Sequence, residues 1–260
     1  MDASDLKSEL RRAASAERAS ASAWFFKTGK GEYGEGDKFL GVSMPEQRKI
    51  AGGYFKARPA PACRETLAVV RDLLRSEFHE DRMTALLILV ACYKRSGAGD
   101  RQRIFDFYMK NLKHINNWDL VDSSAPYIVG VHLLDKDASV LSSLAESENL
   151  WARRVAVLAT APFIREGRFS EILHLAERLL IEKKDSHDLM HKSVGWMLRE
   201  VGKQDRAVLE AFLDRFGACL PRTALRYAIE RFPEAQRLTY LHAPSSSLLK
   251  KEDGGKSGQG

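Results

Sequence analysis

The stretch HINNWDLVDSSAPY, residues 114–127, contains the start and the end of a short helix. Its two consecutive asparagines are residues that cap helices, so we expect a helix to open at Trp118, and Pro126 limits how far that helix can run. The same succession of a helical segment and a break recurs along almost the whole chain between residues 3 and 242. Strand-like alternation of polar and apolar residues is hard to find in that range. The stretch is therefore typical of the chain, and it indicates an all-helical protein.

Apolar residues recur at three- and four-residue spacing throughout this region, which predicts helices. The first predicted helix, over residues 5–26, is rich in alanine and carries arginines on its polar side. A glycine-rich loop follows at residues 29–37. The other predicted helices, separated by breaks that contain Gly, Pro, Asn or Asp, lie near residues 45–57, 62–76, 78–95, 100–113, 117–125, 126–134, 137–146, 149–160, 169–183, 187–202, 204–216, 221–231 and 233–242.

The lengths of these segments predict how the helices are arranged. Helices of about 10–17 residues with short connections favour helix pairs stacked side by side, and a period near 35–40 residues is typical of HEAT-like or armadillo-like repeats. We therefore predict an all-α fold, a right-handed α-solenoid with a concave basic groove, in one domain over residues 1–244. The polar, glycine-rich residues 245–260 are predicted to be a disordered tail.

Composition limits the class of protein. The 260 residues are 44% hydrophobic and 29% charged, which is ordinary for a soluble globular protein. Lys and Arg outnumber Asp and Glu by 41 to 35, an excess that permits nucleic-acid binding without being diagnostic of it. Cys63, Cys92 and Cys219 lie far apart, which argues against a disulfide framework or a cysteine zinc site. No apolar run reaches the ~18 residues of a membrane span, so we expect a soluble, cytoplasmic protein without membrane contacts.

Trp118 and Asp122 are four residues apart, so they share one face of the short helix. A large aromatic ring beside a carboxylate suits a site that must hold and stabilise a positive charge. The alternative, which this pair alone leaves open, is a core tryptophan and a solvated aspartate.

A second helix begins with NLWARR, residues 149–154. Adjacent residues on a helix point about 100° apart, so one of Arg153 and Arg154 can face the core side or a groove while the other sits in water. Two solvated arginines are the open alternative.

A third helix contains HKSVGWMLRE, residues 191–200. Its Lys192, Trp196 and Arg199 fall on one stripe, while the apolar residues between them can face the core. A tryptophan on the basic side of a helix suits stacking or cation–π contact with a ligand, flanked by phosphate binders. A tryptophan partly buried between helices is the alternative. In a solenoid, the spacing of about 35–45 residues between these segments would place equivalent faces side by side along one groove.

Gly29, Gly31 and Gly34 form a G-x-G-x-x-G pattern, but a helix precedes it where a dinucleotide fingerprint requires a strand. Acidic residues within the loop would also repel a pyrophosphate. We expect a flexible loop that edges a binding surface, with Lys27 and Lys30 able to reach phosphates.

His187 and His191 are four residues apart on a predicted helix, which imitates a metalloprotease pair. Asp188 stands where that motif requires Glu, and no third ligand is evident. We expect the start of a helix with a solvent-facing histidine pair, and neither a metal nor another cofactor.

Four stretches of the chain resemble the AlkD-like DNA alkylation repair family: FFKTGKGEYGEGDKFLGVSMPEQRKIA (25–51), INNWDLVDSSAPYIVG (115–130), NLWARRVAV (149–157) and DLMHKSVGWMLREVGK (188–203). The resemblance runs in order across roughly residues 5–240. It implies a HEAT-like all-helical solenoid that acts as a DNA glycosylase on N3- and N7-alkylated purines such as 3-methyladenine and 7-methylguanine. Double-stranded DNA with alkylated purines would be its partner, with no obligate protein partner and no cofactor.

The resemblance also implies roles for individual residues. Asp122 matches the family's essential carboxylate, Trp118 the aromatic that precedes it, Arg154 the second arginine of L-W-x-R-R, and Trp196 the tryptophan of G-W-x-L-R-E. These four are the expected catalytic residues. From the spacing, Asp119 is expected to be a bystander, because only Asp122 shares the face of Trp118 at a distance of four residues. The expected DNA-binding residues are Phe25, Lys27, Lys30, Arg48, Arg153, Lys192 and Arg199.

Phe25 is the nearest match to an N-terminal aromatic that is Tyr in some members of the family, so this chain offers no hydroxyl there. Glycosylases commonly flip the target base into a pocket. The resemblance implies instead a groove that captures the DNA backbone and leaves the lesion in or near the stack, and the sequence alone leaves both modes open.

The main alternative is a non-catalytic solenoid scaffold for damaged or branched DNA or for a protein partner, because most solenoids are scaffolds. The joint presence of Trp118, Asp122, Arg154 and Trp196 on comparable helix faces favours an enzyme, since a scaffold would not need them.

Overall fold

The computed structural model describes residues 1–243, and its regular elements over that range are helices, with a single isolated bridge between Lys38 and Phe78. The predicted all-α class is confirmed, while the solenoid arrangement and the single domain over 1–244 stay predictions. The predicted tail at 245–260 lies outside the described residues. Packing divides the chain into two compact units, Met1–Lys136 and a second unit from Asp137 onward.

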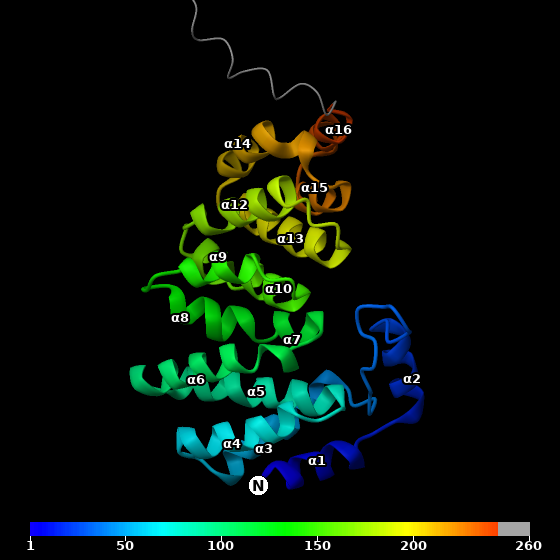
Figure 1. Cartoon of the computed structure of the whole chain (residues 1–260), viewed down its shortest axis with the longest axis vertical. Helices are drawn as coiled ribbons and strands as arrows, with labels where there is room; N and C mark the ends of the chain where they lie inside the picture. Colours follow the sequence, from blue (N-terminus) through cyan, green and yellow to red (C-terminus); the bar gives the residue numbers. More distant parts are fainter. Residues whose placement is uncertain (244–260) are drawn as a thin grey trace, which may run out of the picture. The chain divides into compact units, whose positions relative to one another are not determined.

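The first unit is built around one long buried helix, α5. It packs against α3, α4, α6 and α7, and the α1 helix also touches it. Side chains on several faces of α5 are fully buried, among them Met83, Leu86 and Leu89. The elements of this unit are α1 (Ala3–Arg12), α2 (Ala16–Phe25), α3 (Met44–Ala57), α4 (Cys63–Leu74), α5 (His79–Arg95), α6 (Ala98–Lys110), η1 (Leu112–His114), α7 (Trp118–Asp122), η2 (Pro126–Gly130) and α8 (Val131–Leu133) (Figure 1).

The predicted single helix over residues 5–26 is wrong, because the chain breaks between α1 and α2. Ser15 caps α2 with its side chain, and its backbone N–H donates to the carbonyl of Leu40 at 2.9 Å. Gly41, with φ +75°, lies against the backbone carbonyl of Ser15 so closely that a Cβ would come within 2.2 Å of it. The returning chain therefore occupies the space that a continuous helix would need.

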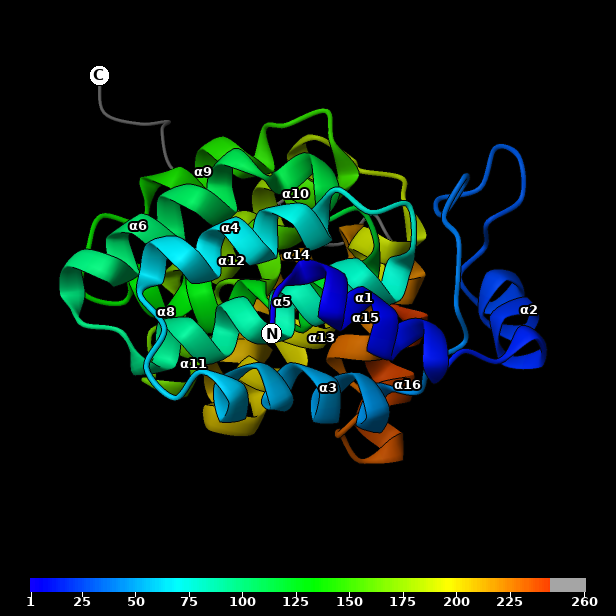
Figure 2. The same ribbon diagram turned by 90° about the horizontal axis from the view of Figure 1, so that it is seen from below.

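The two halves of the predicted helix also differ in what they bury. α1 buries Leu6 and Leu10, whereas α2 has no buried residue. Within the first unit, the ribbon of α2 runs to one side of the other helices in both views (Figures 1 and 2), and the aromatic residues at its end reach α7.

The second unit is built around α13, which packs against α10, α11, α12, α14 and α15. Gly195 lets α13 and α15 approach, because a Cβ there would lie 2.5 Å from the carbonyl oxygen of Ala224. The elements of this unit are α9 (Ser139–Ala145), α10 (Leu150–Leu158), α11 (Ala161–Arg165), α12 (Ser170–Ala176), η3 (Glu177–Glu182), α13 (Asp188–Gln204), α14 (Arg206–Phe216), η4 (Gly217–Cys219), α15 (Arg222–Ala228) and α16 (Glu234–His242).

Most predicted helices of both units agree with the structure to within a few residues, apart from the first. The short helix α11 was not predicted; it opens with Pro162 in its first turn and buries Phe163. No helix in the described chain has the length and apolar character needed to cross a membrane.

Candidate functional site

The short helix α7 begins at Trp118, as its asparagine cap predicted. The side chain of Asn117 accepts a hydrogen bond from the backbone N–H of Trp118 at 2.8 Å. Leu120 and Val121 are fully buried, while Trp118 and Asp122 are half-buried. The helix therefore turns its apolar residues inward and leaves the tryptophan and the carboxylate on a partly accessible face, as their spacing predicted.

Two aromatic residues at the end of α2 pack against Trp118. The Phe26 ring stacks on it, with centroids 5.2 Å apart and planes at 19°, and Phe25 meets it edge-on at 6.0 Å. We call Phe25, Phe26 and Trp118 the aromatic wall. Phe25, the residue singled out from the sequence, is the outer member, and Phe26 is the inner one.

The end of α2 also presents exposed aromatic and basic side chains. Trp24 is 77% exposed and Phe25 is 56% exposed. The Lys27 ammonium lies 5.6 Å from the Trp24 ring, and Lys30 is exposed in the loop. Arg48 is exposed on α3. Cations beside accessible aromatic rings suit a polyanion that carries stackable bases.

The glycine-rich loop is closed by its own carboxylates. Glu32 accepts from the backbone N–H of Gly29 at 3.0 Å, and Glu35 accepts from that of Gly31 at 2.8 Å. These are the donors that a phosphate-binding loop would offer to its ligand. In this arrangement two of those donors are already occupied by the loop's own carboxylates.

The last acidic residue of the loop, Asp37, is buried in a charged network. His79, at the start of α5, lies between two carboxylates: its Nδ1 is 2.9 Å from Asp37 Oδ2 and its Nε2 is 2.8 Å from Asp119 Oδ2. Arg82 donates to the second oxygen of Asp37 and, at 3.0 Å, to the backbone carbonyl of Ser76. Asp119, expected to be a bystander, is thus tied into the interior.

Burial and charge act in opposite directions in this network. Burial disfavours a charged imidazole, but Asp119 and Asp37 outweigh it and raise the pKa of His79 to about 9. Burial likewise opposes the charge of Asp37, but His79 and Arg82 lower the pKa of that carboxyl below its ordinary value. At neutral pH the network contains an imidazolium ion between two carboxylates.

One buried cluster was not predicted from the sequence: the first turn of α5, where His79, Glu80, Asp81 and Arg82 are all buried. The Glu80 carboxylate accepts from three successive backbone N–H groups of residues 40–42. Asp81 forms a two-bond ion pair with an arginine of α1. The signal was present, because four consecutive polar residues cover every face of a helix at about 100° each and some must point inward.

In the second unit, Arg153 and Arg154 are both held by internal partners. Arg154 is buried and donates to the backbone carbonyl of Leu189, on α13, at 2.7 Å. Arg153 pairs with Asp185 at 2.7 Å and donates to two carbonyls of the α9–α10 connection. Neither guanidinium sits in water, contrary to the expectation for one of them, because α13 supplies a partner for Arg154 and the connections that precede α10 and α13 supply those of Arg153.

The predicted stripe on α13 is present in the structure. Lys192, Trp196 and Arg199 are half-buried. The residues expected to face the core are at most 1% exposed; they are Val194, Met197, Leu198 and Val201. The i, i+4 and i+3 spacing therefore separated the two faces of the helix correctly.

Acidic side chains partner this stripe. The Lys192 ammonium lies 2.6 Å from Asp188, and the Trp196 indole N–H donates to Glu200 at 3.2 Å. Arg199 pairs with Glu230. A phosphate that binds here must displace the carboxylates from Lys192 and Arg199.

The histidine pair at the start of α13 is structural. His187 caps the helix by accepting from the backbone N–H of Leu189 at 3.1 Å, and His191 Nε2 lies 2.6 Å from the carbonyl oxygen of Asp185. Both are half-buried rather than solvent-facing. Across residues 1–243, no three His, Cys, Asp or Glu side chains gather as metal ligands would.

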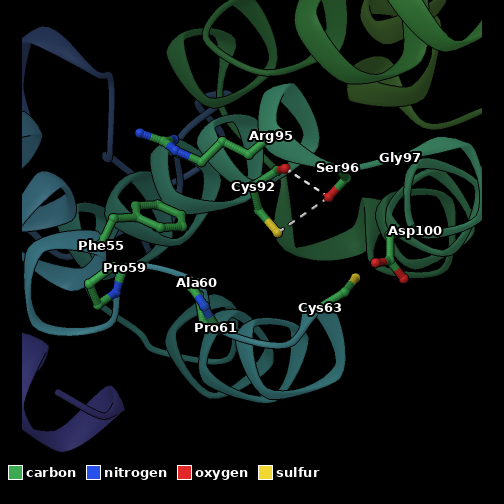
Figure 3. A pocket seen from close by; sticks show the side chains of 10 residues that line it. All are labelled: Phe55, Pro59, Ala60, Pro61, Cys63, Cys92, Arg95, Ser96, Gly97 and Asp100. Atoms are coloured by element: carbon green, nitrogen blue, oxygen red, sulfur yellow. Dashed lines mark hydrogen bonds between the residues drawn. The ribbon is translucent and has the colours of Figure 1, made fainter.

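A cavity of about 320 Å³ lies at the far end of α5 (Figure 3). Cys63 and Cys92 line it, and burial raises the pKa of both thiols, that of Cys63 to about 11. Such thiols are poor nucleophiles at neutral pH. Arg95, also in its lining, is sixteen residues beyond His79, or about 24 Å along the helix. The cavity is therefore separate from the aromatic wall.

The candidate residues thus form two groups, one on each unit. Phe25, Trp118 and Asp122 gather at α7 and the end of α2, while Arg154 and Trp196 belong to α10 and α13.

Comparison with known proteins agrees with this description. One solved structure, described as a predicted DNA alkylation repair enzyme from Enterococcus faecalis, matches with a TM-score of 0.64 at 16% identity, covering 85% of this chain and 97% of that chain. Identity this low shows a shared fold alone. The comparison with curated proteins gives no match. A family model described as DNA alkylation repair enzyme matches residues 6–232, so the chain belongs to the DNA alkylation repair enzyme family.

Proposed function

We propose that the protein is a DNA glycosylase that hydrolyses the N-glycosidic bond of N3- and N7-alkylated purines in duplex DNA. The observation that carries this proposal is that Asp122 and Trp118 share the partly accessible face of α7, next to two further aromatic rings. Membership in a DNA alkylation repair family supports the substrate class.

One carboxylate is enough for this reaction. An alkyl group on N3 or N7 makes the purine cationic, so the base leaves without the general acid that ordinary glycoside hydrolysis requires. The bond from C1′ to the base breaks with its electron pair going to the base, which departs neutral. Positive charge develops on the deoxyribose, where Asp122 stabilises it. Water then adds to C1′ and gives up a proton to Asp122 or to solvent.

The remaining residues hold the DNA in this proposal. Trp118 and Trp196 contact the sugar and backbone, and Arg154 binds a phosphate. The hydrogen bond from Arg154 to the carbonyl of Leu189 fixes the orientation of its guanidinium. The helices form a HEAT-like solenoid whose groove captures the backbone, and the lesion stays in or near the base stack.

The direct test is release of the modified base. Purified protein is incubated with duplex DNA that contains 7-methylguanine, and released bases are separated by chromatography. We expect free 7-methylguanine and no free guanine. DNA binding without release of any base would instead support a scaffold for damaged DNA.

A further inference from the structure

The buried network at His79 joins three segments that are far apart in the sequence. Asp37 ends the glycine-rich loop, His79 opens α5, and Asp119 belongs to the first turn of α7. Asn117, the cap of α7, also donates to Asp37, at 3.3 Å. The glycine-rich loop and α7, the helix that bears Asp122, are therefore both bound to the side chain of His79.

The protonated imidazole is the form that fits this position. A charged imidazole donates from both ring nitrogens, whereas a neutral one donates from a single nitrogen and leaves the other facing a carboxylate as a second acceptor. The charged groups around the ring are Asp37 from the loop, Asp119 from α7 and Arg82 from α5 itself. Side chains of His79 and Asp37 are only 3% and 2% exposed, so water compensates little for a lost bond.

The same imidazole is packed between aromatic rings that lead to the wall. Phe39 stacks on His79 with centroids 4.7 Å apart, and Phe26 lies 5.1 Å from it. Phe26 stacks in turn on Trp118. The position of the inner ring of the wall thus depends on His79 on one side and on Trp118 on the other.

We infer that Asp37, His79 and Asp119 form a clamp that holds the end of α2 against α7 and so positions the aromatic wall beside Asp122. His79 is a positioning residue: it fixes Phe26 by stacking and α7 through Asp119, and it need not touch DNA. The use of the clamp in excision rests on the proposed function. The existence of the clamp does not rest on the proposed function, so the clamp and its use in excision can be tested separately.

Trp118 can report on the clamp without any activity measurement. The chain has four tryptophans, so 5-fluorotryptophan labelling gives four fluorine resonances, and Trp118→Phe identifies the one of interest. Raising the pH deprotonates His79, whose pKa is about 9, and releases the clamp. We expect the Trp118 resonance to shift with a midpoint near pH 9 in the unaltered protein.

His79→Gln tests the same point at constant pH, and the chain offers a matched control. His132 is a second buried histidine of the first unit. It is hydrogen-bonded to Tyr93 and stacked on Phe105. We expect His79→Gln to displace the Trp118 resonance at neutral pH and to abolish its titration near pH 9. His132→Gln should leave both unchanged.

Excision tests the use of the clamp. In single-turnover assays with 7-methylguanine duplex, we expect His79→Gln to slow excision at least about tenfold, because small misplacements of a site are costly. We expect His132→Gln to stay within about twofold of the unaltered protein, because it leaves the wall in place. A folded His79→Gln that excises at the unaltered rate would overturn the positioning role.

The pH titration of the unaltered protein keeps the clamp falsifiable if His79→Gln fails to fold. A Trp118 resonance that stays constant from pH 7 to beyond 9 would overturn the clamp itself. If the unaltered protein releases no base, the proposed function falls, and the fluorine titration still decides whether the clamp exists.

Discussion

His79 Nε2 lies 2.8 Å from the Asp119 carboxylate, one residue after the tryptophan of the candidate site. This contact gives the two aspartates of W-D-L-V-D different surroundings. Asp119 points into the interior and pairs with His79, while Asp122 lies on the partly accessible face of α7 with Trp118. The catalytic role of Asp122 stays a prediction, and nothing in the spacing showed that Asp119 pairs with His79.

The charged network makes the stability of the protein depend on pH. In the unfolded chain His79 loses its proton near pH 6.5, and in the folded protein it keeps the proton up to about pH 9. Its contribution is therefore complete below pH 6.5 and is lost as the pH rises through 9. The shift corresponds to roughly 3 kcal/mol.

Denaturant unfolding of the unaltered protein and of His79→Gln between pH 7 and 9.5 measures how much protonated His79 contributes to the free energy of unfolding. We expect the difference between the two proteins to shrink as the pH rises. His114, His132 and His187 have lowered pKa values, so they have already lost their protons in this range. If the difference in unfolding free energy between the two proteins does not depend on pH, His79 is not protonated in the folded protein.

The two phenylalanines of the wall should behave differently. Phe26 is half-buried and stacks on Trp118 and Phe39, so Phe26→Ala should cost about 2 kcal/mol of unfolding free energy. Phe25 is 56% exposed, so Phe25→Ala should change stability by less than about 0.5 kcal/mol and weaken DNA binding instead. Urea unfolding and duplex titration measure the two effects, and equal stability losses would contradict the inner and outer assignment.

The close approach of α13 and α15 predicts an intolerant glycine. Gly195→Ala would place a Cβ 2.5 Å from the carbonyl oxygen of Ala224, so we expect a loss of about 1–3 kcal/mol. Gly52 in α3 is the matched control, because a Cβ there meets nothing within 4 Å. Gly52→Ala should stabilise the protein by about 0.5–1 kcal/mol. Urea midpoints that move in the same direction for both variants would refute this account of Gly195.

Lys192 is the better of the two predicted phosphate contacts on α13. Its pair with Asp188 is half-exposed, and such pairs contribute little, so a phosphate can replace the carboxylate. The logarithm of DNA affinity falls linearly with the logarithm of salt concentration. We expect Lys192→Ala to reduce the steepness of that slope by about one. Arg206→Ala removes a comparably exposed i, i+4 pair on α14 and is the control. Equal slopes for the two variants would remove Lys192 from the interface.

Local patterns in the sequence predicted most of the helices and both faces of α13. Apolar periodicity records which side of a helix is buried, and that information is local. The break at Ser15 could not be found in this way, because helix propensity is continuous there and the cause is the distant segment at Leu40 and Gly41. The sequence resemblance to the DNA alkylation repair family is confirmed by the family match.

The buried charged network at His79 could not be predicted from the sequence. The acids in the loop were interpreted as repelling a phosphate, and nothing in their spacing showed that Asp37 pairs with a histidine 42 residues away. Pairings of this kind depend on tertiary contacts. The clue that sequence did offer, four polar residues in succession at His79–Arg82, indicated burial but not partners.

The central claim is that Asp122 carries the chemistry, and Asp122→Asn tests it most directly. The substitution keeps the shape of the side chain and removes its charge, with Asp119→Asn as the neighbouring comparison. Single-turnover excision of 7-methylguanine from duplex DNA is measured for Asp122→Asn, after its folding and DNA affinity have been checked. We predict a loss of at least about a hundredfold in rate with duplex binding retained. Excision at the unaltered rate by the folded variant would contradict the account.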